Sequence, residues 1–279
     1  MKKVLKSVFW AFVVGFCVVM GVQPSDANTS IRVKGSDEMA GRVDYQAKMF
    51  AKDHAGVTVT VSGGSTGTGL PDLLEGNCEV VMSGHELTGE EEQKVKAKGI
   101  QLVKRLVGYG GIAILTYPEN PIDELTVDQV QKLMRGDYTS WDQVGGPNVP
   151  VVVVSLEAVA SDTRMFLLND FLRVPSVKSQ VLRVLSFRSI INKVIETRGA
   201  LGYCRIRDLE GSEEAQRVKV LKIKKDASSP GVLPSRRSIA DESYAIRRPF
   251  SLWVGANAAP EVKTFVDFVV SKGWGAQIK

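Results

Sequence analysis

The sequence predicts an α/β protein, and three observations support this prediction. Short runs rich in β-branched residues alternate with segments whose apolar residues recur at helical spacing, a pattern typical of helices packed on a largely parallel sheet. The run 57–62 alternates valine with threonine or serine, and the glycine- and hydroxyl-rich loop 63–69 leads from it into a helix. The chain has 279 residues, enough for one or two compact domains after an N-terminal export segment.

The first 27 residues have the features of a secretory signal peptide. Lys2, Lys3 and Lys6 precede a nearly unbroken apolar run from 8 to 22, and small residues up to Ala27 form a cleavage site. We therefore expect an exported, periplasmic protein that begins near residue 28. A retained membrane anchor is the alternative, although the apolar run is short for a membrane span.

The composition of the exported part excludes some classes of function. Cleavage leaves 33 basic and 30 acidic residues, and a net charge of +3 gives no support for nucleic-acid binding. Cys78 and Cys204 also remain. In an oxidising compartment they could pair, but two buried free thiols are at least as consistent with the sequence.

The first part of the chain predicts strands and helices in short alternation. The segment 30–35 alternates as a half-buried strand, and Ser36 and Asp37 can cap the helix that follows it. Beyond the strand 57–62 we expect a helix ending near 76, a strand at 78–83, a helix at 90–98, and strands at 101–107 and 110–117.

The middle and end of the chain continue the alternation. Thr126 has the spacing of a capping box and begins a helix, 138–146 is a tryptophan-containing loop, and 150–155 is a buried strand. We then expect helices at 162–171, 177–184 and 189–196, strands at 201–206 and 218–223, an unpatterned segment at 227–241, a last strand at 251–254 and a last helix at 260–270.

Three loops share one design that is suited to binding an anion. Each places a hydroxyl group and free backbone N–H groups at the start of a helix, an arrangement that holds tetrahedral oxyanions. The residues are Ser36, Asp37 and Glu38 in the first loop, Ser65, Thr66 and Thr68 in the second, and Ser161, Asp162 and Thr163 in the third. One such loop is typical of an ordinary helix cap, whereas three together favour a binding site.

Catalytic and metal sites have less support. The segment 63–67 matches the G-x-S-x-G motif of serine hydrolases, with Ser65 as nucleophile, but His85 is the only later histidine and follows it by just 20 residues. The histidines and Cys78 match no recurrent metal-ligand spacing, and no lysine follows Gly69 as in a Walker loop, so we expect no metal and no cofactor. His85 follows a strand end, where ligands collect in open α/β sheets, and we add it to the candidate ligand-binding residues.

The order of these motifs resembles the periplasmic phosphate-binding proteins of the phosphate ABC transporter, the PstS-like family. The segments that carry the resemblance are 33–37, 62–69, 79–87, 111–114, 120–121, 125–126, 141–146, 199–203 and 244–249. The resemblance implies a two-lobed type II periplasmic-binding-protein fold (Venus flytrap) in which each lobe is a mixed sheet flanked by helices. It also implies that 1–27 is the signal peptide, that 28–112 and 247–279 form lobe I, and that 113–246 form lobe II, with a hinge near Gly110 and Arg247.

The implied function is that of a monomeric binding protein, not an enzyme. It would close on phosphate or a related small oxyanion and present it to the permease of an ABC transporter. Four positions depart from the family: His85 and Leu156 stand where the family has arginines, Asp162 stands where it has a glycine, and Glu38 stands where it often has a threonine. We therefore expect a site without those two guanidinium groups and with the added carboxylates of Glu38 and Asp162. An alternative is a divergent sensory or accessory protein that no longer binds phosphate tightly.

Overall fold

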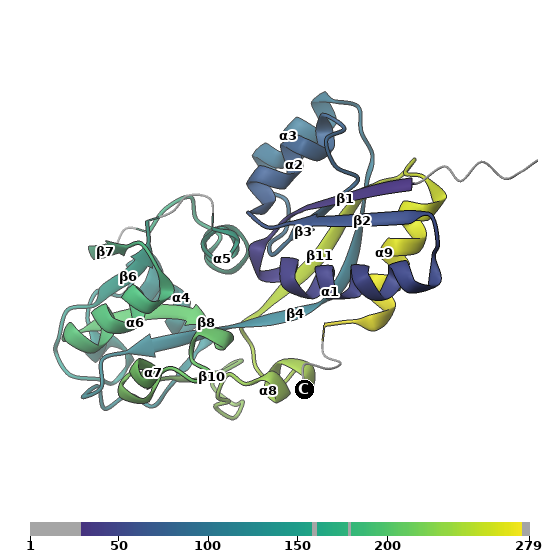
Figure 1. Ribbon diagram of the computed structural model, residues 1–279. Coiled ribbons are helices and arrows are strands. Elements are labelled where there is room, and N and C mark those ends of the chain that lie inside the picture. The colour runs from purple at the N-terminus through teal and green to yellow at the C-terminus, as the bar shows by residue number, and fades with distance from the viewer. Residues whose placement is uncertain (1–28, 158–160, 178–179, 275–279) are drawn as a thin grey trace, which may run out of the picture.

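A single long strand, β4 (Leu102–Thr116), joins two halves of the protein. In the computed structural model, which describes residues 29–157, 161–177 and 180–274, Figure 1 shows β4 leaving one layered α/β half and entering the other. The strands of the main sheet follow one path, in the order β2 (Val57–Ser62), β1 (Thr29–Gly35), β3 (Val80–Ser83), β11 (Arg247–Gly255), β4, β8 (Ala200–Arg205), β6 (Val152–Leu156) and β7 (Gln180–Val184). In addition, β9 (Lys219–Val220) pairs with β4, and β5 (Glu124–Thr126) and β10 (Lys222–Lys224) form a separate two-stranded sheet. Hydrogen-bonded strands therefore run continuously from one half into the other.

The first half is a sheet covered by helices on both faces (Figure 1). Its strands are β1 (Thr29–Gly35), β2 (Val57–Ser62), β3 (Val80–Ser83), β11 (Arg247–Gly255) and the start of β4, and its helices are α1 (Asp37–Asp53), α2 (Thr66–Leu74), α3 (Gly89–Ala97) and α9 (Pro260–Lys272). Successive strand residues point to opposite faces. Val80 and Met82 accordingly join the core under α1 and α9, whereas Val81 joins the core under α2 and α3.

The second half has its own core around the end of β4. Trp141 is buried at its centre, and the indole Nε1–H donates to the Gly199 carbonyl at 2.9 Å. The elements of this half are β5 (Glu124–Thr126), α4 (Val127–Arg135), η1 (Trp141–Val144), β6 (Val152–Leu156), α5 (Asp162–Met165), the π-helix η2 (Phe166–Leu172), β7 (Gln180–Val184), α6 (Phe187–Glu196), β8 (Ala200–Arg205), η3 (Ile206–Asp208), α7 (Glu213–Arg217), β9 (Lys219–Val220), β10 (Lys222–Lys224) and α8 (Arg236–Ala240).

The sheet is parallel toward its ends and antiparallel where the halves meet. β1 pairs in parallel with β2 and β3, and β6 pairs in parallel with β7 and β8. β11 runs antiparallel to β3 and β4, and β4 runs antiparallel to β8. The prediction of mixed sheets is confirmed, and the largely parallel sheet expected from the alternation alone is wrong at the centre.

The chain passes between the halves where β4 and β11 lie side by side. Arg247 pairs with Gly111 and Arg248 with Gly110, and Ile112 N–H donates to the Ile246 carbonyl at 3.2 Å. One buried core contains residues from 112 to 246, and another contains residues from 31 to 107 and from 250 to 269. The lobe boundaries expected from the sequence, near residues 112 and 247, lie where the chain passes from one core to the other. That each lobe moves as a rigid body stays a prediction.

Several predicted elements differ from the structure, among them the strand expected at 218–223, which is two strands, β9 paired with β4 and β10 paired with β5. The helix expected at 177–184 is wrong, because Gln180–Val184 forms β7 in parallel with β6; Val181 and Val184 favour a strand, and the open edge of β6 supplies the partner. The two strands expected at 101–107 and 110–117 are one strand, β4, since β11 pairs along both of them. The segment expected to be unpatterned contains the short helix α8, begun by a Ser235 capping box.

A glycine lets the end of β1 approach β3. Gly35 has φ +125°, and a Cβ at this position would lie 2.2 Å from the Met82 carbonyl oxygen. The next residue, Ser36, donates its N–H to that same oxygen at 2.9 Å. Because only glycine fits this contact, the start of α1 is fixed against the end of β3.

The two cysteines give a test of this packing. Cys78 and Cys204 are free and buried, and burial raises the pKa of the Cys78 thiol to about 11 and also raises that of Cys204. Since the thiolate is the reactive form, we expect Ellman's reagent at mildly alkaline pH to label neither cysteine in the folded exported protein and to label both in concentrated guanidinium chloride. Rapid labelling of the folded protein, or no labelling after denaturation, would contradict this packing.

Candidate functional site

The starts of α1 and α2 lie together at the side of the first half that faces the second. Asp37 N–H donates to the Gly64 carbonyl at 3.0 Å, which joins the first turn of α1 to the loop before α2. A Cβ at Gly69 would lie 3.0 Å from the Gly35 Cα, so the first turn of α2 rests on the end of β1. Two of the three predicted loops therefore form one surface.

The third loop reaches this surface through Asp162. Its Oδ1 accepts a hydrogen bond from the Thr66 N–H at 2.9 Å, and its Oδ2 accepts one from the Gly84 N–H at 3.2 Å. The Nε2 of His85 lies 3.7 Å from Oδ1. With only 7% of its surface exposed, Asp162 is a carboxylate held in the cleft by backbone donors of the opposite half.

The absence of a side chain at Gly84 permits this contact. A Cβ there would lie 3.2 Å from the Asp162 Cβ, 3.3 Å from Oδ2 and 3.4 Å from the Cζ of Arg248. The carboxylate and the guanidinium therefore approach the chain from different elements and meet above this glycine.

Arg248 is the buried cation of the cleft. It is 1% exposed, its Nη1 donates to Thr163 Oγ1 at 2.5 Å, and its Nη2 donates to a carboxylate oxygen of Glu38. Its guanidinium also lies 4.9 Å from the centre of the Phe250 ring. Arg248 thus binds one residue from each side of the cleft, α1 and α5.

A second guanidinium, that of Arg205, lies near the Glu38 carboxylate. Arg205, at the end of β8, has its Nη1 4.0 Å from Glu38 Oε2 and is hydrogen-bonded to Asp208 at 2.8 and 2.6 Å. Burial is the largest single effect and lowers the pKa of Arg205, but the hydrogen bonds with Asp208 and the negative charges of Asp208, Glu38 and Asp37 together outweigh it, so the pKa is raised overall. Arg205 is therefore charged and contributes positive potential beside Glu38.

The hydroxyl groups behind the cleft are bonded to each other. Thr66 Oγ1 donates to Ser83 Oγ at 2.9 Å, and Ser83 Oγ donates to the His85 carbonyl at 2.7 Å. The His85 Nδ1 lies 2.6 Å from the Glu86 carbonyl oxygen, and since a carbonyl only accepts, Nδ1 carries the proton. This network holds the Thr66 and Gly84 N–H groups toward the cleft.

Two buried polar atoms of the cleft residues have no partner within the described part of the chain. They are Ser36 Oγ and Arg248 Nε, and both residues are 1% exposed. Leaving a buried polar group unpaired costs about 1–3 kcal/mol, so a ligand that reaches these atoms would gain affinity.

The predicted site residues fall into three groups. Those brought together in the cleft are Ser36, Glu38, Thr66, His85, Asp162 and Thr163. Those used as helix caps are Ser65 and Thr68, which form a reciprocal capping box, and Ser161, which accepts from the Arg164 N–H at 3.4 Å. Asp37 is exposed at the start of α1. The ligand-binding role of all ten residues stays a prediction.

Sequence reasoning missed Arg248, Arg205, Ser83 and Gly84. Only Arg248 carried a usable signal. Arg248, Phe250, Leu252 and Val254 share one face of β11 by strand alternation, which puts the arginine on the apolar, inward face. The expected loss of guanidinium groups is thus offset by arginines from β11 and β8, strands that are distant in sequence from the motif loops.

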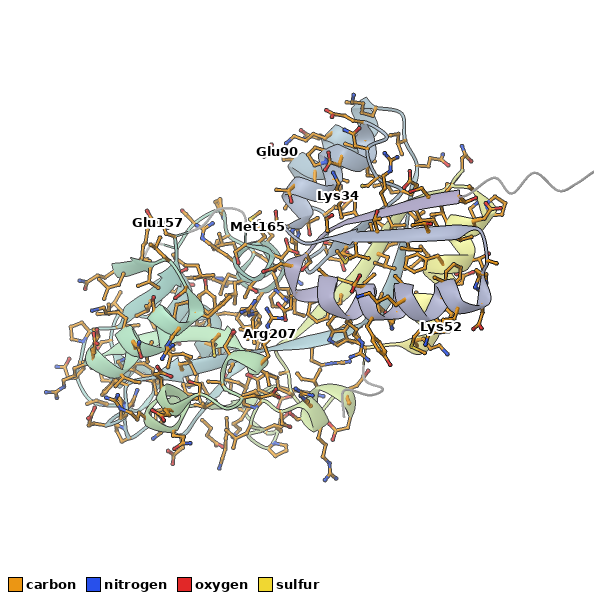
Figure 2. All side chains as sticks on the ribbon, in the orientation of Figure 1. Lys34, Lys52, Glu90, Glu157, Met165 and Arg207 are labelled. Atoms are coloured by element: carbon orange, nitrogen blue, oxygen red, sulfur yellow. The ribbon has the colours of Figure 1, made fainter. Side chains whose placement is uncertain are left out.

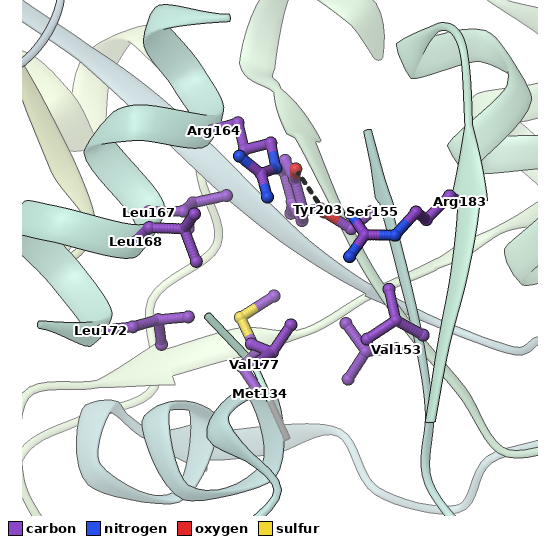
Figure 3. Close-up of a pocket in the computed structure, with 11 residues that line it drawn as sticks. Met134, Val153, Ser155, Arg164, Leu167, Leu168, Leu172, Val177, Arg183 and Tyr203 are labelled. Atoms are coloured by element: carbon purple, nitrogen blue, oxygen red, sulfur yellow. Dashed lines mark hydrogen bonds between the residues drawn. The ribbon is translucent and has the colours of Figure 1, made fainter. Parts of the chain in front are cut away.

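An enclosed pocket in the second half is a separate feature. Its volume is about 20 Å³, and Figure 3 shows Leu167, Leu168 and Val153 lining it, with Arg164 and Arg183 near the hydrogen bond between Ser155 and Tyr203. This volume accommodates little more than one water molecule. In the described residues, no group of three His, Cys, Asp or Glu side chains is arranged to hold a metal ion. The convergence of backbone donors and charged groups, rather than an open pocket, therefore makes the junction of the two halves around Asp162, called the cleft here, the candidate site.

Comparisons with known proteins agree with this fold. The family model of the PBP superfamily domain matches residues 22–272. The phosphate-binding protein PstS of Staphylococcus aureus (strain USA300) is 22% identical over 249 residues, covering 88% of this chain and 74% of that protein.

Solved structures share the architecture. An ABC-type phosphate transport receptor from Vibrio cholerae superposes with a TM-score of 0.67 at 26% identity, over 86% of this chain and 93% of that one. A phosphate ABC transporter substrate-binding protein from Clostridium perfringens, solved with bound phosphate, gives a TM-score of 0.59 at 26% identity, with coverage of 86% and 93%. The predicted two-lobed type II fold and the resemblance to the PstS-like family are confirmed.

Truncating Arg248 tests the charge balance of the cleft. Arg248→Ala leaves the Glu38 carboxylate buried without its main partner, so we expect the free energy of unfolding to fall by about 3–5 kcal/mol. Equilibrium unfolding in urea measures this loss. Arg237→Ala, at a side chain that is 95% exposed, is the control and should change stability by less than about 0.5 kcal/mol.

The pair itself is tested by a double variant. Glu38→Ala combined with Arg248→Ala should lose less stability than the two single variants added together, because neither charge is then left unpaired. Simple additivity would contradict the ion pair.

Proposed function

Because the chain belongs to the family of PBP superfamily domains, we propose that it is the solute-binding protein of an ABC transporter and that its solute is phosphate or a related small oxyanion. The protein works as a monomer and carries out no catalysis. It takes up the solute between the two halves and presents it to a membrane permease.

The observation that carries this proposal is the position of the Asp162 carboxylate. Two backbone N–H groups bind its oxygens at 2.9 and 3.2 Å, and the buried guanidinium of Arg248 approaches Gly84 from the same side as the carboxylate. A cleft that holds a carboxylate in this way has the donors and the positive charge that an oxyanion requires.

The donors suit a tetrahedral anion better than a planar one. A carboxylate has two oxygens, and it leaves Ser36 Oγ and Arg248 Nε unpaired. An oxyanion with four oxygens can accept from further donors in addition to the Thr66 and Gly84 N–H groups. Each hydrogen bond to a charged group contributes about 1.5–3 kcal/mol, so a few of them are sufficient for micromolar affinity.

Carboxylates in the cleft favour an oxyanion that still carries a proton. Glu38 and Asp162 can accept a hydrogen bond from protonated phosphate, whereas sulfate carries no proton at neutral pH and would meet only repulsion. The same argument admits arsenate, whose shape and protonation match those of phosphate.

Solute binding requires the two halves to lie together. The cleft residues come from both halves, and β4 and β11 carry the chain between them near Gly110 and Arg247. A solute that bridges the cleft stabilises the closed arrangement, and the closed form is the one recognised by the permease.

A second candidate function follows from the charges of the cleft. Arg248 and Arg205 face three carboxylates, those of Glu38, Asp162 and Asp208, so the site already holds more negative than positive charge without a ligand. This favours a divergent sensory or accessory protein with weak affinity for phosphate. The serine hydrolase is not proposed, because Ser65 Oγ serves as a helix cap for the Thr68 N–H.

The proposal places the protein outside the cytoplasm. Within residues 29–157, 161–177 and 180–274, no helix combines the length and apolar character that a bilayer crossing needs. The signal peptide expected at 1–27 lies outside the described residues.

Calorimetric titration of the exported protein at neutral pH tests the proposed solute. We expect saturable binding of phosphate and arsenate with a Kd at least ~10-fold lower than that for sulfate or molybdate, because only the first two donate a proton to the carboxylates. Thr163→Val removes a cleft hydroxyl and should weaken phosphate binding ~10-fold, whereas the same change at the exposed Thr139 should leave it unaltered. No heat with any of the four anions, or equal affinity for sulfate, would rule out the proposal.

A further inference from the structure

The carboxylate of Asp162 occupies the donors that the solute needs. Its Oδ1 accepts a hydrogen bond from the Thr66 N–H at 2.9 Å, and its Oδ2 accepts one from the Gly84 N–H at 3.2 Å. Asp162 is 7% exposed, and its carboxylate and the Arg248 guanidinium both lie against Gly84, so the carboxylate has the hydrogen bonds of a bound anion and a positive charge in its surroundings.

These contacts also join the two halves. Asp162 belongs to α5 in the second half, whereas Thr66 and Gly84 belong to the first, and Figure 1 shows α5 at the junction. Two neighbouring hydrogen bonds also join the first half to the second. Arg248 Nη1 donates to Thr163 Oγ1 at 2.5 Å, and Asp170 Oδ2 accepts from the Glu86 N–H at 3.0 Å.

The charge balance of the cleft makes a second anion unfavourable while Asp162 remains in place. The two arginines are ion-paired with Glu38 and Asp208, and Asp162 adds a third carboxylate, so a phosphate placed beside them would be repelled by the nearest carboxylate. The solute and the Asp162 side chain are therefore alternative occupants of the same donors.

We propose that Asp162 is an internal anion that holds the two halves together in the unliganded protein and competes with the oxyanion for the Thr66 and Gly84 N–H groups. Binding of the solute requires the side chain to leave these donors. The two unpaired atoms, Ser36 Oγ and Arg248 Nε, give the solute donors that the carboxylate does not use.

Two consequences follow for the protein in solution. The halves stay together without solute, so binding changes their separation little. The apparent affinity for the oxyanion is lowered by the fraction of molecules in which Asp162 has left the donors. This inference rests on the proposed function, since it assumes that the solute is a small oxyanion, but closure by Asp162 can be measured without any solute.

The test compares the wild type with Asp162→Gly and Asp162→Asn. Glycine removes the carboxylate, and asparagine keeps the side-chain size without the charge. Asp128→Gly is the matched control, because Asp128 also lies in the first turn of a helix and is 66% exposed. Each exported protein is titrated with inorganic phosphate by calorimetry.

The separation of the halves is measured in the same proteins by electron-electron double resonance. Spin labels are attached through Glu90→Cys and Glu157→Cys, two exposed positions that Figure 2 shows on opposite halves with Met165 of α5 between them. The native cysteines are buried and stay unlabelled.

We expect Asp162→Gly to bind phosphate ~10-fold or more tightly than the wild type, since two hydrogen bonds no longer have to be given up. Without phosphate its inter-label distance should be longer than in the wild type and should shorten on phosphate binding. The wild type and Asp128→Gly should show the same short distance with and without phosphate. Asp162→Asn should also bind phosphate more tightly than the wild type and show a longer inter-label distance without phosphate.

The outcomes separate this inference from the proposed function. If both Asp162 variants match the wild type in Kd and in distance, the internal anion is overturned while phosphate binding by the wild type stands. If no protein binds phosphate but Asp162→Gly still opens, phosphate is overturned as the solute and closure by Asp162 stands. If Asp162→Gly binds phosphate more tightly but keeps the wild-type inter-label distance without phosphate, the role of Asp162 in holding the two halves together is overturned.

Discussion

A buried guanidinium between the two halves imposes the arrangement of the cleft. Arg248 is 1% exposed, and an unpaired charge at that depth would cost several kcal/mol. Glu38 supplies the opposite charge from α1, and Thr163 supplies a hydroxyl oxygen from the other half. The first turn of α1, the start of β11 and the start of α5 must therefore meet at this point, so the junction depends on the pairing of buried charges as well as on the two apolar cores.

Two glycines allow the starts of α1, β11 and α5 to come this close together. At Gly35 a Cβ would lie 2.2 Å from the Met82 carbonyl oxygen, and at Gly84 it would lie 3.2 Å from the Asp162 Cβ. The first position sets the start of α1 against β3, and the second lets a carboxylate reach backbone donors from across the cleft. Small size at these positions matters more to the site than the hydroxyl-rich composition of the loops, because several of those hydroxyls serve as helix caps.

An anion site that already contains a carboxylate responds to its solute by exchange. The solute gains the donors only as the side chain gives them up, so affinity reflects the difference between two anions. A tetrahedral oxyanion has more oxygens than a carboxylate and can reach Ser36 and Arg248 Nε, which Asp162 leaves unpaired. A protonated oxyanion can also use the carboxylates as acceptors. Number of oxygens and protonation, more than net charge, are thus the properties by which this cleft distinguishes solutes.

The sequence by itself determined the α/β class, most strands and helices, and three anion-suited helix starts, because periodicity and capping are local in the chain. Its motif order also identified the two-lobed fold. Local pattern failed at 180–184, where pairing with β6 overrides it, and it could not show that Ser65, Thr68 and Ser161 are used as caps. Only the tertiary structure brought Arg248 and Arg205 to Glu38 and placed Asp162 on the Thr66 and Gly84 donors. These contacts join residues up to 210 positions apart, and such pairings are set by how β4 and β11 cross between the halves rather than by any neighbouring residue.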